Sequence, residues 1–182
     1  MSTVSIYSNI NSEYINENSS INIKDPLSLT KYLGEKIIQK SNINYINLRL
    51  PGVLTYNIRI RRTLISKLIH DIKLSKKIKL FNPEKKFNAL IDSFEIFNVI
   101  KKIIREDITG TYNLTSYSGI KFIKIILFIK KFFNSDSKIV FYKKRKKLLY
   151  FSTKKIEKEL NFKPSKILFV LERYLRKYYS IY

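Results

Sequence analysis

Three arginines in the first half of the chain, Arg59, Arg61 and Arg62, have the clearest potential to bind a ligand. They lead into residues 61–74, where leucine and isoleucine recur at helical spacing. The N-terminus of a helix presents unpaired N–H groups to an anion, and guanidinium groups bind phosphate oxygens in pairs. This arrangement suits a diphosphate. A solvated turn is the alternative interpretation of the same residues.

Metal and thiol chemistry are excluded by composition. The chain has no cysteine and a single histidine, His70. Without thiols there are neither disulfides nor thiolate ligands, and one histidine cannot form a histidine metal cluster. His70 lies near the end of a predicted helix and is interpreted as an ordinary polar position. We therefore predict no metal site.

The second candidate for chemistry is Lys31, in a helix predicted from Pro26 to Lys40. Proline suits the first turn of a helix, because the N–H that it lacks would have no partner there. Apolar residues then recur at helical spacing up to Lys40. The position that shares a helix face with Lys31, four residues earlier, is Leu27. Leucine cannot exchange a proton.

These candidates are positioned by strands and helices that alternate along the chain, which indicates an α/β architecture. Residues 9–24 are rich in asparagine and serine and are predicted to form a loop. The predicted strands span residues 3–7, 45–50, 79–81, 87–91, 111–114 and 138–142. The predicted helices span residues 26–40, 61–74, 94–105, 120–133 and 153–160, and a last helix starts at Pro164.

Six segments match, in order, the motifs of one family. The segments are residues 3–8, 25–35, 47–53, 87–95, 110–114 and 151–165. The second keeps the motif positions of Pro26, Thr30, Lys31, Gly34 and Glu35 in a pattern of the form Pro-Tyr-x-x-Ser-Lys-x-x-x-Glu. On these residues the chain resembles the C-terminal part of the extended short-chain dehydrogenase/reductase family, which includes the NAD-dependent sugar-nucleotide epimerases and dehydratases.

The resemblance implies a partial Rossmann-like parallel sheet together with the small C-terminal substrate-binding subdomain of that family. Residues 1–182 would form a single truncated domain. The family's dinucleotide-binding βαβ unit carries the pattern Gly-x-x-Gly-x-x-Gly, and the four glycines of this chain do not form it. We therefore expect that unit to be absent from the chain.

The resemblance also implies roles for particular residues. Lys31 would be a vestigial catalytic lysine that also contacts the nicotinamide ribose, while Leu27 occupies the position of the catalytic tyrosine. Pro51 and Val53 would lie beside the cofactor, which is NAD or NADP in this family. Arg59, Arg61 and Arg62 would bind the nucleotide sugar. A solvated helix lysine is the alternative interpretation of Lys31.

Three functional hypotheses follow from the sequence. The first is a degenerate epimerase or dehydratase that is inactive alone. The second is one half of a split protein, which associates with an N-terminal half. The third is a binding module for a nucleotide sugar, a partner chain or nucleic acid, with its cleft between residues 51–62 and the loop after Phe81. A homodimer is a further possible assembly.

The formal net charge of +22 favours a nucleic-acid partner at first sight. However, the abundant lysine is accompanied by abundant isoleucine, asparagine, phenylalanine and tyrosine, all of which have A/T-rich codons. We therefore attribute the charge to composition and do not expect nucleic-acid binding. The densest basic cluster, Lys143–Lys147, is where such binding would occur. Neither a signal peptide nor an apolar run of bilayer length is visible, which predicts a cytoplasmic protein without membrane contact.

Overall fold

The computed structural model describes residues 1–7, 14–55, 63–142 and 148–179, and all structural statements below refer to these residues. The first part of the molecule is built on a three-stranded parallel sheet of β1 (Ser2–Thr3), β3 (Ile46–Leu50) and β8 (Gly110–Asn113), in the order β1-β3-β8. This order confirms the expected partial parallel sheet. Ser2 pairs with Arg49, and Ile46 pairs with Gly110.

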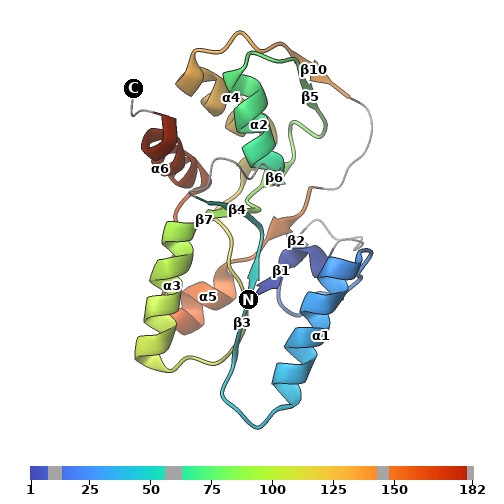
Figure 1. Ribbon diagram of the computed structural model, residues 1–182, viewed down its shortest axis with the longest axis vertical. Helices are drawn as coiled ribbons and strands as arrows, with labels where there is room; N and C mark the ends of the chain where they lie inside the picture. The colour runs from blue at the N-terminus through green and yellow to red at the C-terminus, as the bar shows by residue number, and fades with distance from the viewer. Residues whose placement is uncertain (8–13, 56–62, 143–147, 180–182) are drawn as a thin grey trace.

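Helices cover both faces of this sheet. Helix α1 (Pro26–Lys40) lies on one side, and α3 (Ser93–Glu106) and α5 (Lys154–Leu160) lie on the other (Figure 1). The apolar core between the sheet and the last two helices is made by Leu48, Ile91, Ile96, Val99, Ile103, Tyr112, Leu114, Ile156 and Leu160. The core residues that belong to α3 and α5 recur at helical spacing, so these two segments fold as amphipathic helices.

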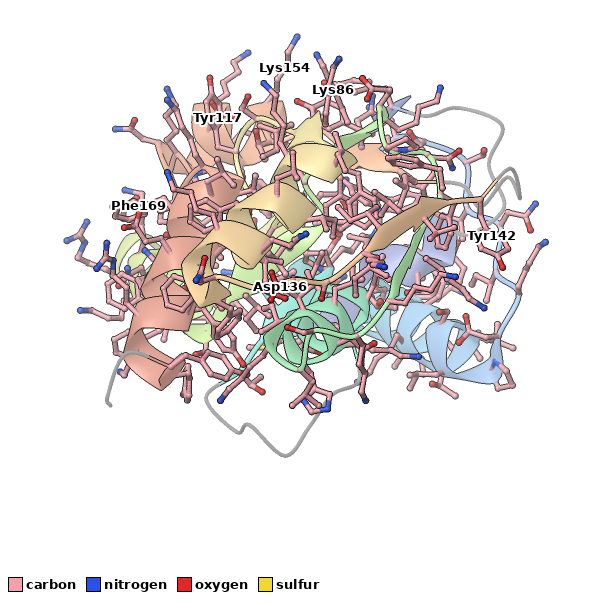
Figure 2. The ribbon with its side chains drawn as sticks, turned by 90° about the horizontal axis from the view of Figure 1, so that it is seen from above. Lys86, Tyr117, Asp136, Tyr142, Lys154 and Phe169 are labelled. Carbon is pink, nitrogen blue, oxygen red and sulfur yellow. The ribbon has the colours of Figure 1, made fainter. Side chains whose placement is uncertain are left out.

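The second part of the molecule contains a parallel strand pair, β5 (Ile78–Leu80) and β10 (Ile139–Phe141). Its helices are α2 (Leu64–Lys73), α4 (Phe122–Phe133) and α6 (Ile167–Tyr179), which are seen from above in Figure 2. Buried apolar side chains of α2, β5, α4 and α6 form one core, against which the partly buried Ile139 of β10 packs. The two parts together confirm the predicted mixed α/β fold, with a partial parallel sheet and a smaller second unit.

Three short strand pairs complete the structure. Strand β4 (Gly52–Leu54) pairs in parallel with β7 (Leu90–Asp92). Strand β2 (Tyr14–Ile15) pairs in parallel with β11 (Tyr150–Phe151), and β6 (Lys86–Phe87) pairs antiparallel with β9 (Ile120–Lys121). Strands of two or three residues are too short to show a period of two, so the sequence did not predict β2, β4, β9 or β11.

The strand predicted over residues 3–7 is wrong except at Thr3. Strand β1 ends at Thr3, and Val4–Tyr7 form a 3₁₀ helix, η1, instead of continuing the strand. Three of its four residues, Val4, Ile6 and Tyr7, are buried. A strand would send alternate side chains to opposite faces, whereas one tight turn lets all three enter the same core.

The helix boundaries follow from local capping. The Asp25 carboxylate accepts a hydrogen bond from the Ser28 backbone N–H at 2.9 Å, and Pro26 opens the first turn of α1. Thr63 and Ser66 form a reciprocal capping box at the start of α2. No helix in the described ranges is both long and apolar enough to cross a membrane.

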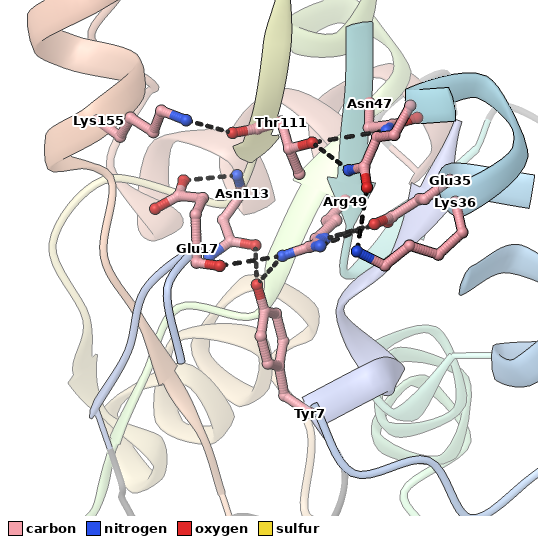
Figure 3. A network of polar contacts seen from close by, with 10 residues as sticks. Tyr7, Glu17, Glu35, Lys36, Asn47, Arg49, Thr111, Asn113 and Lys155 are labelled. Carbon is pink, nitrogen blue, oxygen red and sulfur yellow. Dashed lines mark hydrogen bonds and ion pairs between the residues drawn. The ribbon is translucent and has the colours of Figure 1, made fainter. Parts of the chain in front are cut away.

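A buried ion pair joins α1 to the sheet (Figure 3). Arg49 of β3 donates to the Glu35 carboxylate through Nε at 3.0 Å and through Nη2 at 2.7 Å. The exposed fractions of the two side chains are 5% and 1%. Burial lowers the pKa of Arg49, but the hydrogen bonds that it donates to Glu35 and the nearby Tyr7 raise it by more, so the pKa lies above its ordinary value. The guanidinium therefore stays charged.

The same guanidinium organises a polar network across four elements. Its Nη1 donates to the hydroxyl of Tyr7 and to the backbone carbonyl of Glu17. The Tyr7 hydroxyl donates to Asn113 Oδ1 at 3.3 Å, and the Asn113 backbone N–H donates to the Glu17 carboxylate at 2.7 Å. The network thus connects α1, η1, β3 and β8 (Figure 3).

Removing one charge of this pair should destabilise the fold severely. Replacement of Arg49 by methionine leaves the Glu35 carboxylate buried without a cation, so we expect the free energy of unfolding to fall by about 3–5 kcal/mol. Urea denaturation measures this change. As a control, Lys102→Met disrupts the exposed pair with Glu106 and should cost less than about 1 kcal/mol. The double variant Glu35→Leu/Arg49→Met should be more stable than Arg49→Met alone, and the opposite order would contradict this account.

Candidate functional site

The face of α1 that includes positions 27 and 31 is turned to the outside. Leu27 is 68% exposed and Lys31 is exposed, whereas Ser28 and Glu35 are buried toward the sheet. Positions 27 and 31 are one helical turn apart, which is the spacing at which two side chains meet on one face. In this structure an aliphatic side chain and an ammonium group occupy that spacing. The pair cannot transfer a proton through position 27.

The nearby tyrosine of the same helix does not replace the missing group. Tyr32 is half-buried and packs against the cluster of Val4, Ile6, Tyr7, Ile15 and Phe151. The ammonium group that lies over its ring, at 5.3 Å from the centroid, belongs to Lys36. Tyr32 therefore faces the core, on a different side of the helix from Lys31.

Tyr7 has a phenol beside the Arg49 cation, as a catalytic tyrosine base requires. It is nevertheless not suited to that role. Its side chain is completely buried, and its hydroxyl is already bonded to Arg49 and Asn113. Burial raises the pKa of Tyr7 above its ordinary value, by more than the neighbouring Arg49 lowers it. A general base at neutral pH needs the opposite shift and access to substrate. Tyr7 is a structural residue.

The predicted cofactor residues Pro51 and Val53 lie where β3 passes into β4, at the carboxyl end of the parallel sheet. Ligands of open α/β sheets bind outside this end of the strands. Gly52, between them, packs closely against Thr63, the residue that caps α2. A Cβ atom added at Gly52 would lie only 3.3 Å from Thr63 Cβ. The structure thus brings Pro51 and Val53 to the start of α2. The predicted substrate residues Arg59, Arg61 and Arg62 lie outside the described residues.

Two adjacent clefts open near this end of the sheet. The first has a volume of about 320 Å³ and is largely apolar. The second, also of about 320 Å³, combines two tyrosines with two lysines and one glutamate. Leu148 belongs to both. The first is lined by Val4, Ser5, Leu64, Phe87, Ala89, Leu148, Leu149 and Phe151, and the second by Tyr14, Glu84, Lys85, Lys86, Leu148 and Tyr150.

The second cleft can hold an aromatic or sugar group beside an anion. The rings of Tyr14 and Tyr150 lie 5.6 Å apart, and Lys85 and Lys86 supply positive charge. The loop after Phe81 was expected to border a cleft, but the tyrosines were not identified from the sequence. They come from strands of two residues, which leave no periodic signal.

A second polar cluster, at the end of β7, is structural. Asp92 is fully buried, caps α3 and accepts two hydrogen bonds from Arg173, at 2.7 and 2.9 Å. Arg173 also donates to Glu95, whose carboxylate accepts the Ser165 hydroxyl. Asp92 is the last residue of β7, and Glu95 lies in the first turn of α3.

No protein-family model matches the sequence, and no curated protein matches it. Solved structures, in contrast, share its fold. A dTDP-4-dehydrorhamnose reductase from Clostridium acetobutylicum has a TM-score of 0.78 and 17% identity, covering 97% of this chain and 64% of its own. The fold is that of the NAD-dependent sugar-nucleotide epimerases and dehydratases.

Two further structures agree. UDP-glucose 4-epimerase from Thermotoga maritima, solved with UDP-glucose, has a TM-score of 0.73 and 16% identity over 97% of this chain. dTDP-glucose 4,6-dehydratase from Bacillus anthracis, solved in complex with NAD, has a TM-score of 0.75 and 14% identity over 100% of this chain. In both cases the match covers 62% of the other protein, so this chain spans about three fifths of the length of these enzymes.

The packing of Tyr150 in the wall of the second cleft can be tested by substitution of a neighbouring glycine. A Cβ atom at Gly119 would lie 2.6 Å from the Tyr150 ring and 3.3 Å from the Phe87 backbone, so Gly119→Ala must displace the tyrosine. We expect it to lower the free energy of unfolding by about 1–3 kcal/mol. The control is Gly34→Ala in α1, where nothing lies within 4 Å, and which should stabilise the protein by up to about 1 kcal/mol. Equal effects in urea denaturation would contradict the close contact at Gly119.

Proposed function

We infer that this chain is a relative of the sugar-nucleotide epimerases and dehydratases that performs no hydride chemistry on its own. The observation that carries this inference is Leu27, which is exposed on the helix face where the resemblance requires a tyrosine. A tyrosine has an unperturbed pKa of ~10 and acts as a base only when a cation stabilises its phenolate. Lys31 supplies the cation, but position 27 has no phenol for it to act on.

The cofactor side is also incomplete in this sequence. NAD or NADP would supply the hydride, and Lys31, Pro51 and Val53 would contact its nicotinamide end. The pyrophosphate is usually held by a glycine-rich turn at a helix N-terminus. The four glycines of the chain, at positions 34, 52, 110 and 119, do not form that turn. Residues 1–182 therefore do not contain the turn that would hold the pyrophosphate.

A binding module is the second candidate, and the clefts favour it. An apolar surface beside Lys85 and Lys86 suits a nucleotide sugar, whose diphosphate is anionic and whose base and sugar present flat faces. Arg59, Arg61 and Arg62 would add charge from the segment that precedes α2. Binding of such a ligand requires neither the tyrosine nor the cofactor.

A partner chain is supported by two surfaces of the first part. Strand β1 is an edge strand, and beside it an apolar groove of about 160 Å³ is lined by Met1, Ile46, Leu48, Ile100, Ile103 and Ile104. An N-terminal half that continues the parallel sheet would cover both. The exposed side chains Leu29, Leu33 and Ile37 of α1 form a stripe that a homodimer partner would cover.

The purified chain should not bind NAD(H) or NADP(H), because the Lys31 contact is a small part of the usual site. Isothermal titration calorimetry measures this, and micromolar affinity for either cofactor would contradict the proposal. UDP-glucose, titrated in the same way, separates the two candidates. A binding module should release or absorb heat with UDP-glucose and lose that signal when Lys85 and Lys86 are both replaced by glutamine.

The variant Leu27→Tyr should remain inactive. Its tyrosine would lie one turn from Lys31, yet no bound nicotinamide would accept the hydride, and the reaction needs both. The assay follows conversion of UDP-glucose and dTDP-glucose with added NAD, with the unmodified chain as the control. Turnover by Leu27→Tyr would overturn the inference and would reveal a cofactor site within this chain.

A further inference from the structure

The outer face of the β5–β10 strand pair combines lysines with an exposed aromatic ring. Val140 pairs with Lys79 in register, so Lys79, Val140 and Tyr142 point to the same side, away from the buried Ile78 and Leu80. Tyr142 is 48% exposed, and the Lys79 ammonium lies 5.5 Å from the centre of its ring. Figure 2 shows Tyr142 at the end of β10, at the periphery of the molecule.

The pairing also brings together two stretches without acidic residues. Between Asp71 and Glu84 the sequence has four lysines, and between Asp136 and Glu157 it has eight basic residues, with no acid in either stretch. Lys77 and Lys79 from the first and Lys138 from the second are exposed at this sheet. The two stretches are far apart in the sequence, and the parallel pairing of β5 with β10 brings Lys77, Lys79 and Lys138 to one sheet.

Composition explains the number of lysines but not this arrangement. On α3 and α6, basic residues pair with acids of the same helix, as Lys102 does with Glu106 and Arg176 with Glu172. At the β5–β10 face, Lys79 forms no ion pair with a described residue, and its ammonium instead lies over the tyrosine ring. An anion is therefore the complementary partner of this face.

We propose that the outer face of β5 and β10 binds single-stranded nucleic acid, with Tyr142 as a stacking platform for a base and Lys77, Lys79 and Lys138 as contacts to phosphates. A half-exposed ring on a sheet can stack on an unpaired base but not on one within a duplex. Stacking tolerates any base, and lysines contact the backbone, so the binding is sequence-independent.

This site is separate from the nucleotide-sugar clefts, because none of its residues lines either cleft. The proposal therefore stands or falls independently of the proposed function. The basic residues Lys143–Lys147 follow Tyr142 in the sequence but lie outside the described residues, and the proposal does not include them.

The test is fluorescence anisotropy of the full chain with labelled oligothymidylate and oligouridylate of about 20 nucleotides, longer than the usual site sizes. We expect Tyr142→Ala to weaken binding roughly tenfold, because it removes one stacked base, and Tyr142→Phe to retain it. Lys79→Gln should reduce the log–log salt slope by about 0.7, the value for one phosphate contact on a single strand. A duplex of the same length should bind more weakly and should not respond to Tyr142→Ala.

The chain contains a matched control on α3. Phe97 is 58% exposed, and the Lys101 ammonium lies 5.2 Å from its ring centre, so Phe97→Ala and Lys101→Gln remove an equivalent ring and charge elsewhere. Equal losses from Phe97→Ala and Tyr142→Ala would overturn the proposal, as would equal affinity for the duplex. Tyr142-dependent binding to phosphatidylserine vesicles without binding to oligonucleotides would also overturn it and would assign the face to membranes. Thermal melting of each variant checks that the fold is intact.

Discussion

The buried pair of Glu35 and Arg49 is the constraint on which the first part of the molecule depends. Each charge is almost completely removed from water, so each requires the other at hydrogen-bonding distance. The pair fixes how α1 is rotated about its axis on the sheet. With Glu35 facing β3, Leu27 and Lys31 are exposed. The same guanidinium holds Tyr7 and, through it, Asn113, so the position of η1 depends on this pair as well.

This dependence distinguishes the residues of α1 that the fold requires from those that it does not. Among the motif residues of α1, Pro26 begins the helix and Glu35 anchors it to the sheet, so both are required by the fold itself. Leu27, in contrast, is 68% exposed and makes no such contact. Under the proposed function, a leucine at this position leaves the packing of the helix intact while providing no group that can exchange a proton.

The second part of the molecule is stabilised by a different interaction, the burial of apolar side chains beside a two-stranded sheet. Helix α2 packs against β5, α4 packs against α2, and α6 packs against α4. The outer face of β5 and β10 is left to solvent with its lysines and Tyr142. A half-buried sheet sorts its residues by alternation, so the apolar ones enter the core and the basic ones gather outside. A compositional excess of lysine becomes a localised positive surface for this reason.

The sequence by itself determined the helices and the presence of a partial parallel sheet. Helical periodicity, with Asp25 and Pro26 at its start, predicted α1 at its observed limits, and the motif order predicted the parallel sheet. Both signals are local. Tertiary structure alone decided that Val4–Tyr7 form a tight turn, because three buried side chains must enter one core. It also decided that Asp92, at the end of β7, is paired with the distant Arg173. The clefts and the basic sheet face likewise join residues far apart in the chain, and no local pattern records which distant segments will meet.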